Sequence, residues 1–332
     1  GRTVRRHPMK EFIMHYRRLG RSGMKVSEIS LGTWLTIGEQ LDEASSKQLI
    51  HAAYDQGINY FDSADINGGG ETEVVLGKCI ADLPRSELVL SSKAFYPTSG
   101  GPNGRGLSRK HITESLHASL RKMGTDYLDL YYCQRYDPDT PIEEVVRTMD
   151  ILIRQGKILY WGTSEWEPYQ ITQAIGVARE AGMTPPTMEQ PQYNMFTREN
   201  VELRLAPLCH EVGLGLTVWA PLQFGVLSGK YNEAIPPGSR AVREGKNWMH
   251  NHLTPEKIVM VREITALASL MGYTTAQLAI AWLLRRKEVS SVITGATRPE
   301  QIDENLVAME LHENLSEETL DQIEQILGNT PV

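Results

Sequence analysis

The chain of 332 residues lacks the features that mark several large classes of protein. Its three cysteines, Cys79, Cys133 and Cys209, show no paired spacing, which argues against a disulfide framework and a cysteine-bound metal. No segment approaches the ~18 to 20 apolar residues that span a bilayer. The net charge of −7 argues against non-specific binding to nucleic acid or to an anionic membrane. We therefore expect a cytoplasmic protein that acts on a small-molecule substrate and binds neither nucleic acid nor a membrane.

Residues 1–15 are basic at their start and lack the apolar core of a signal peptide. We expect them to be a disordered leader or a remnant of expression. Residues 16–332 are expected to form a single domain, because α/β barrels commonly use about this length as one unit.

Short β-rich runs alternate along the chain with longer segments of helical period. The expected strands are 28–34, 60–65, 88–94, 127–133, 158–164, 187–193, 215–221 and 289–295. The clearest helices are 43–56, 109–123, 142–155 and 169–181. This alternation, with no Pro- or Ser-rich linker, predicts an α/β fold consisting of a single (β/α)8 TIM barrel. A doubly wound sheet is the alternative, but no G-x-G-x-x-G follows the first strand.

Three further segments complete this expectation. Residues 16–26, with Ser22 and Gly23 as a turn, predict an N-terminal β-hairpin that closes the barrel floor. Residues 315–327 predict an amphipathic C-terminal helix. The segment 224–253 is rich in Gly, Pro and Asn and too long for an ordinary connection, so we expect a functional loop over the barrel mouth.

Polar residues end several of the expected strands, and such ends meet at one mouth of a barrel. The second strand carries Asp62, the third ends near Lys93, and Gln134 follows the fourth. Ser164 and Gln190 occupy the ends of the fifth and sixth. Each residue alone is most often a structural cap, and an Asp beside a Lys is most often a plain ion pair. Their convergence favours an active site.

Several ordered runs carry a resemblance to a known family. They are LGTW at 31–34, EVVLG at 73–77, GLSRKH at 106–111, DPDTP at 137–141, YWGTS at 160–164, PPGSR at 236–240 and QLAIAW at 277–282. On these runs, residues 16–329 resemble the aldo-keto reductase superfamily, and most closely the branch of the potassium-channel β-subunits and their bacterial relatives. The resemblance implies NADPH as the cofactor, bound extended across the barrel mouth, and allows a homo-oligomer.

The resemblance also assigns cofactor-binding residues by position. Near the nicotinamide ribose it places Thr33, Trp34, Gln40 and Asp62. Ser164 and Gln190 are expected at the carboxamide, and Trp219 against the ring, followed by Ala220 and Pro221. The phosphate and adenosine side is expected to use Leu222, Lys230, Arg240, Gly295, Thr297, Gln301, Glu304 and Asn305. Loops after the last two strands, with a helix N-terminus, form an anion site on physical grounds alone. Lys230, Thr297 and Arg298 would serve a 2′-phosphate, which favours NADP over NAD.

The catalytic set that the resemblance implies is incomplete. The family uses a Tyr acid, a Lys and an Asp that tune it, and a His or Asn near the substrate oxygen. Asp62 and Lys93 match, but Asn67 stands in the Tyr position and Gln134 in the His or Asn position. Loss of a general acid typically costs ~10² to 10⁴ in rate. Tyr96 is the nearest other phenol, and its spacing differs, so ordinary aldehyde reduction should be weak.

Three explanations remain open. The chain is an inactivated or engineered relative that still binds NADPH, a cofactor-sensing binding protein, or a reductase whose substrate brings its own proton. A protonated imine needs only hydride, and neutral amides at Asn67 and Gln134 do not repel it. Asp62 attracts the cation, whereas Lys93 opposes it unless it is paired to Asp62. We hypothesise an NADPH-dependent reductase acting on C=N or on activated C=O.

The substrate pocket and metal content complete the sequence-based picture. The pocket is expected to use Trp34, Ile66, Phe95, Tyr96, Tyr136, Trp166, Phe224 and Trp248, which indicates an apolar or aromatic substrate. Asp65 and Glu71, beside the glycine-rich run at 68–70, are expected to be solvated carboxylates, and no metal site is predicted.

Overall fold

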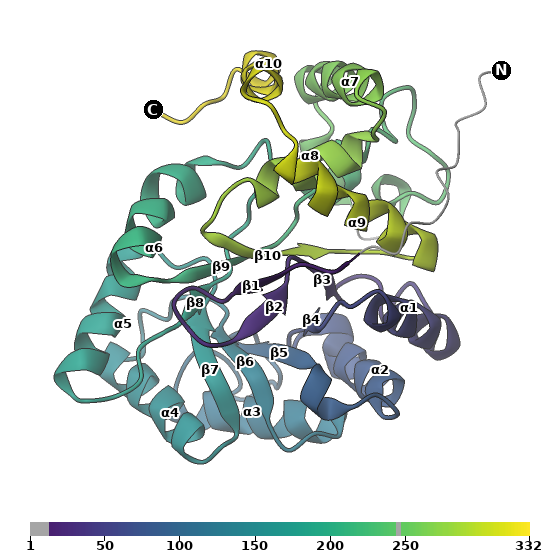
Figure 1. Ribbon diagram of the computed structural model, residues 1–332. Helices are drawn as coiled ribbons and strands as arrows, with labels where there is room; N and C mark the ends of the chain where they lie inside the picture. The colour runs from purple at the N-terminus through teal and green to yellow at the C-terminus, as the bar shows by residue number, and fades with distance from the viewer. Residues whose placement is uncertain (1–12, 244–246) are drawn as a thin grey trace.

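The computed structural model describes residues 13–243 and 247–332 and shows a closed barrel of eight parallel strands (Figure 1). The barrel strands are β3 (Ile29–Gly32), β4 (Tyr60–Asp62), β5 (Val89–Ala94), β6 (Leu128–Cys133), β7 (Ile158–Thr163), β8 (Met188–Glu189), β9 (Gly215–Val218) and β10 (Val289–Thr294). They follow chain order around the barrel, and β10 closes it against β3. The predicted (β/α)8 fold is confirmed. Most of the expected leader, residues 1–12, lies outside the described residues.

Ten α-helices connect or flank these strands in the described chain. They are α1 (Glu43–Asp55), α2 (Glu71–Ile80), α3 (Arg109–Met123), α4 (Ile142–Arg154), α5 (Pro168–Glu180), α6 (Ala206–Val212), α7 (Pro255–Leu270), α8 (Thr275–Leu284), α9 (Pro299–Glu313) and α10 (Glu317–Leu327). Their ends follow the local signals. The Ser108 hydroxyl accepts from the N–H of His111 at the start of α3, and Gly156 and Gly182 take positive φ after α4 and α5.

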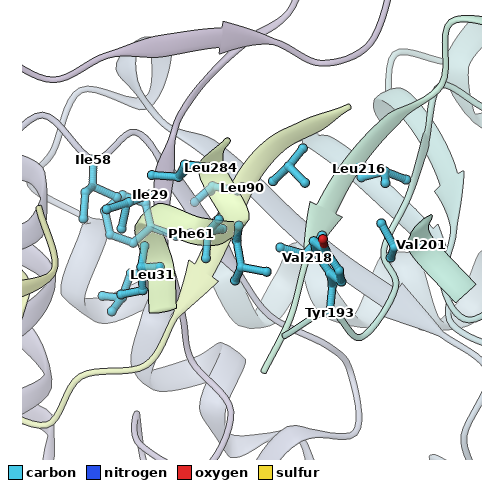
Figure 2. Close-up of a cluster of buried hydrophobic side chains, with 14 of the residues drawn as sticks. Ile29, Leu31, Ile58, Phe61, Leu90, Tyr193, Val201, Leu216, Val218 and Leu284 are labelled. Carbon is cyan, nitrogen blue, oxygen red and sulfur yellow. The ribbon is translucent and has the colours of Figure 1, made fainter. Parts of the chain in front are cut away.

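The core has two layers, one on each side of the barrel wall. Between the sheet and the helices lie fully buried side chains such as Ile29, Phe61 and Leu90 (Figure 2). A smaller cluster inside the barrel includes Tyr60, Tyr132 and Leu19. Leu19 joins β1 (Tyr16–Arg18) to the turn before β2 (Lys25–Ser27), so the predicted hairpin packs against the barrel interior. The floor is therefore closed, and access is left to the opposite mouth.

Several strand ends and one long segment differ from the sequence-based expectation. Strands β4 and β9 end at Asp62 and Val218, three residues before their expected bounds. Strand β8 is only Met188–Glu189, because Pro191 has no N–H to continue the ladder. The long segment after β9 is not irregular throughout: it contains the 3₁₀ turns Gln223–Ser228, Arg240–Val242 and Asn247–His252. Among the described residues no single helix is long and apolar enough to cross a membrane; α7 and α8 pass only as a pair bent by 90°.

The close contact of β7 with β8 gives a test of the fold. A Cβ on Gly162 would lie 2.2 Å from the carbonyl oxygen of Met188, whereas the exposed Gly176 of α5 has open space around it. Gly162→Ala should therefore lower the free energy of unfolding by about 1–3 kcal/mol. Gly176→Ala, the matched control, should raise it by about 0.5–1 kcal/mol. Urea unfolding measures both, and equal effects would contradict this packing.

Candidate active site at the barrel mouth

A buried ion pair lies at the ends of β4 and β5. The Lys93 ammonium donates to both carboxylate oxygens of Asp62 at 2.8 Å and to the carbonyl of Ser63 at 2.6 Å. Both side chains are buried. An ammonium has three N–H donors, so all three are used within the protein. Lys93 therefore has no donor left for a substrate or for a neighbouring acid.

Asp62 is held by further donors from the barrel interior. Its Oδ1 accepts from the hydroxyl of Tyr60 at 3.0 Å, from that of Ser91 at 2.7 Å and from Nε2 of Gln190 at 3.0 Å. Burial raises the pKa of the Tyr60 phenol well above its ordinary value, with the Asp62 charge adding to it, so the phenol stays a neutral donor. The Asp62 carboxylate is thus held in place by hydrogen bonds from three uncharged side chains as well as by Lys93.

Asn67 follows β4 on a glycine-rich 3₁₀ turn, Asn67–Gly70. Gly68, Gly69 and Gly70 all have positive φ, a conformation that glycine adopts without steric cost. The turn delivers the Asn67 amide to the same cavity as Lys93. The position that the family resemblance gives to a phenolic acid therefore holds a side chain that cannot act as one.

Gln134 and Arg135 enter the cavity directly after β6. Oε1 of Gln134 is buried and has no hydrogen-bond partner among the described residues. Arg135 makes one side-chain hydrogen bond in that part of the chain, to the carbonyl of Gln134, and its guanidinium lies 5.6 Å from the Tyr96 ring centroid. An unpaired amide oxygen and a largely unpaired guanidinium can bind a donor and an anionic group of a ligand.

These groups line one cavity of about 800 Å³. It also contains most of the expected cofactor residues, namely Trp34, Gln40, Ser164, Gln190, Trp219, Ala220, Pro221, Leu222, Lys230, Arg240, Gly295, Thr297 and Gln301. The cavity is large enough for an extended ligand. The structure therefore brings the two predicted sets of residues, catalytic and cofactor-binding, into one site.

Three expected cofactor residues lie outside the lining. Thr33 is buried, and its hydroxyl donates to the carbonyl of Asp62 at 3.0 Å, so it supports the site from behind. Glu304 is exposed on α9, and its backbone carbonyl accepts from Gln277. Asn305 is buried on the same helix. The substrate-pocket expectation is met by Trp34, Ile66, Tyr96 and Phe224 but not by Phe95, Tyr136, Trp166 and Trp248, which do not line the cavity.

The aromatic residues at the mouth form a packed group. The ring centroids of Trp34 and Phe224 are 6.3 Å apart, and Trp34 and Trp219 are 6.4 Å apart. Nε1 of Trp219 donates to Glu165 at 2.8 Å, which fixes the plane of the indole. Trp219 thus offers a rigid flat face to the cavity.

Backbone strain is concentrated around this mouth. Within the described chain the non-glycine residues with positive φ are Leu35, Glu165, Ala220, Gln223 and Phe224, with φ between 46° and 65°. All follow the C-terminal ends of β3, β7 or β9. Such conformations persist only where surrounding contacts enforce them, and they cluster at functional sites. The loops after β3, β7 and β9 therefore have a fixed conformation.

Three cations occupy the other end of the cavity. Lys230, Arg240 and Arg243 all line it, and no described carboxylate lies within ion-pair distance of any of them. Burial, reinforced by the neighbouring arginine charges, lowers the pKa of Lys230, and burial also lowers that of Arg240. Lys230 is exposed and the two arginines are half-buried, so this cluster of like charge can attract an anionic group of a ligand. This end of the cavity therefore fits the phosphates of a dinucleotide, with the N-terminus of α9 beside it.

Some site residues were missed from the sequence. Tyr60, Ser91 and Thr217 face the barrel interior, and their link to Asp62 depends on strand register. Arg243 contacts Gln40 at 2.7 Å across 203 residues of sequence. Tyr60 and Ser91 could have been found from the sequence, because alternate residues of β4 and β5 face the barrel interior.

Comparisons with known proteins identify the relatives of this chain. The sequence model described as the Aldo/keto reductase family matches residues 28–328. The chain is 46% identical over 322 residues to a probable voltage-gated potassium channel subunit beta of Arabidopsis thaliana, covering 96% of this chain and 98% of that one. It is 45% identical over 322 residues to a protein of the same description in Oryza sativa subsp. japonica, with the same coverage. A putative voltage-gated potassium channel subunit beta of Schizosaccharomyces pombe is 45% identical over 324 residues, covering 96% and 94%.

Two further carboxyl groups near the site are buried. Asp65 was expected to be solvated, but this is wrong: it is 2% exposed, and neither carboxyl oxygen has a hydrogen-bond partner among the described residues. The chain after β4 turns back under the glycine turn, so Asp65 faces the protein interior. Burial, with the Glu73 charge adding to it and the Lys122 charge opposing it, raises its pKa to about 7. Burial likewise raises the pKa of Glu189 to about 8.

Asp65 predicts a pH dependence of stability. Between about pH 4 and pH 7 the folded state holds a proton that the unfolded state has lost, so the free energy of unfolding should fall as the pH rises. The cost above pH 7 is at most about 4 kcal/mol, since one pKa unit corresponds to about 1.4 kcal/mol. Asp65→Asn should remove this contribution and be more stable than the wild type at pH 8. Urea unfolding from pH 5 to 8 measures it; Glu189 still titrates in the variant, so the difference between the two proteins isolates Asp65. Parallel curves would contradict the burial of a titrating Asp65.

Proposed function

Because the chain belongs to the aldo/keto reductase family of nicotinamide-dependent oxidoreductases, we propose that it is an NADPH-dependent reductase of C=N bonds (imines or iminium ions) or of activated C=O groups. The observation that carries the proposal is that neither position 67 nor Lys93 offers an available acid at the catalytic end of the cavity. All three N–H donors of Lys93 are hydrogen-bonded to Asp62 and Ser63, and the Asn67 amide is not an acid. The site can position a substrate, but the side chain at the family's acid position has no proton to give it.

Iminium and carbonyl reduction differ in whether the protein must supply a proton, and this difference favours one substrate class. A bound reduced nicotinamide supplies a hydride, which carries two electrons. An iminium carbon accepts it while the nitrogen takes the π electron pair, and the product amine is neutral without a further proton. A carbonyl oxygen treated in the same way becomes an alkoxide and needs an acid. The missing acid therefore penalises aldehydes far more than protonated imines.

Several residues of the cavity suit a protonated imine better than an aldehyde. The unpaired Oε1 of Gln134 can accept the N–H of an iminium, which orients the C=N bond toward the cofactor end of the cavity. The Asp62–Lys93 pair is neutral as a unit, so it does not repel the cation as an isolated ammonium would. Trp219 would hold one face of the nicotinamide ring and so leave the other face open to the substrate. The aromatic mouth around Trp34 and Phe224 suits an apolar or aromatic substrate.

The cofactor preference is supported by charge. Lys230, Arg240 and Arg243 supply more positive charge than a pyrophosphate end alone requires, which favours the additional phosphate of NADPH over NADH. Thr297 and Gln301 stand at the same end, where the Thr297 N–H and hydroxyl donate to Oε1 of Gln301. A cytoplasmic setting, where NADPH is abundant, agrees with three free and buried cysteines.

An alternative function is an NADPH-binding or sensing protein with little or no turnover. The relatives' descriptions as potassium channel β-subunits favour it. On this alternative the cavity binds cofactor, and a homo-oligomer presents the outer helices to a partner. Tight NADPH binding without oxidation by any imine or activated aldehyde would select it, and light scattering after size exclusion would give the oligomeric state.

Asn67→Tyr tests the role of the missing acid. The variant should raise the single-turnover rate of NADPH oxidation by an activated aldehyde by ~10² to 10⁴, because a phenol at this position can protonate the oxygen. The rate with a preformed cyclic imine should change little. Both are measured by stopped-flow absorbance of NADPH.

Asn67→Gln is the matched control, since it keeps an amide and adds no acid. It should leave the aldehyde rate low. A wild-type protein that already reduces the aldehyde as fast as Asn67→Tyr would contradict the assignment and require another proton donor.

Arg240→Met tests the phosphate end. Removing this half-buried charge should weaken NADPH binding about tenfold or more and NADH binding much less, because only NADPH carries the extra phosphate. Fluorescence titration gives both dissociation constants. Arg179→Met, on the exposed surface of α5, is the control. Equal losses for the two cofactors would place Arg240 at the shared pyrophosphate instead.

A further inference from the structure

We propose that His15, Glu28, His312 and Glu313 bind one divalent transition-metal ion, with zinc as the best fit, at the floor of the barrel. The site lies at the end opposite the active-site mouth. His15 precedes β1, Glu28 lies between β2 and β3, and the other two residues end α9. Figure 1 shows the β1–β2 hairpin lying across this end of the barrel. The proposal is independent of the reductase function, and the sequence predicted no metal here.

The backbone brings the ligands together. The N–H of Glu28 donates to the carbonyl of His15 at 3.0 Å, which fixes these two residues side by side. Among the described residues, His15, His312 and Glu313 form the one group of three or more His, Cys, Asp or Glu side chains whose ligand atoms all lie within 4.8 Å of one another. Residues from both ends of the domain therefore meet at one point.

Glu28 adjoins the group of His15, His312 and Glu313 without belonging to it. Two of three ligand separations match a tetrahedral site, and the third, between His15 and Glu28, is longer. Nε2 of His312 lies 3.3 Å from Oε2 of Glu28, and Nδ1 of His15 lies 3.5 Å from Oε1 of Glu313 and 3.9 Å from Oε2 of Glu28. A tetrahedral zinc ion with bonds of ~2.0–2.2 Å requires its ligand atoms to be ~3.3–3.6 Å apart. Two imidazoles and two carboxylates are ligands that zinc accepts.

Burial argues against a simple ion pair. Glu28 is 5% exposed, and neither its Oε2 nor the Nε2 of His312 makes a hydrogen bond within the described chain, although the two atoms are only 3.3 Å apart. The other oxygen of Glu28 accepts from Nε of Arg17 at 2.6 Å, and Arg17 also donates to the carbonyls of Leu284 and Val289. This outer contact orients the carboxylate and leaves Oε2 for a cation.

His210 and Glu288 provide an ordinary pair for comparison. Their side chains approach to 3.2 Å, and His210 is largely exposed. No third ligand joins them in the part of the chain that the structure describes. His210→Gln is therefore the matched control for variants of the proposed site.

Cobalt(II) is the probe for the test, because tetrahedral cobalt absorbs visible light. The full chain, stripped with EDTA, should bind one equivalent of cobalt with this absorption, and zinc should displace it. Zinc should also raise the melting temperature. His15→Gln and Glu313→Gln, both at partly exposed positions, should bind cobalt about tenfold or more weakly and lose the zinc-dependent shift, as should His312→Gln. His210→Gln should behave as the wild type.

Two results would overturn the proposal. One is the absence of a tetrahedral cobalt spectrum in the wild type. The other is unchanged binding in His15→Gln and His312→Gln, which would place the metal elsewhere. Circular dichroism confirms that each variant is folded before its affinity is compared.

Discussion

The buried Asp62–Lys93 pair is the interaction on which the rest of the site depends. Taking two charges out of water is costly, and the pair persists because both partners are fully hydrogen-bonded by Ser63, Tyr60, Ser91 and Gln190. That saturation has a chemical consequence. An ammonium whose donors are all used cannot activate a neighbouring acid, so the loss of a phenol at position 67 is not compensated by Lys93. The catalytic end of the cavity is consequently polar and lacks an acid at position 67.

The two ends of the cavity have different characters. At one end, Lys230, Arg240 and Arg243 have no carboxylate within ion-pair distance among the described residues, which favours binding of an anion. At the other end, the unpaired amide oxygen of Gln134 and the aromatic rings of Trp34 and Phe224 can bind a flat ligand that carries a hydrogen-bond donor. The loops after β7 and β9, which contain residues in strained backbone conformations, form the part of the cavity wall between its two ends. The barrel below contributes rigidity through its closed floor, so recognition is left to the mouth loops.

The sequence predicted the barrel well because its signals are local. Period, caps and glycine stops located all eight strands and the main helices, although β4, β8 and β9 end three to four residues before their expected bounds. Asp62, Lys93 and Gln190 could be placed because parallel strand ends converge. Features that depend on side-chain direction or on distant contacts could not be predicted. Asp65 lies only three residues after Asp62 but turns inward, and Tyr60 reaches Asp62 from inside the barrel. His15 and His312 meet only once the chain has closed on itself.

The central claim is that the substrate, and not the protein, supplies the proton. The most direct test is the pH dependence of single-turnover NADPH oxidation with a cyclic imine whose own pKa is known. The account predicts a rate that follows the protonated fraction of the imine, with no additional protein pKa and no solvent deuterium effect on hydride transfer. A rate governed by a protein group, together with a substantial solvent isotope effect, would show that the site contains an acid and would contradict the account.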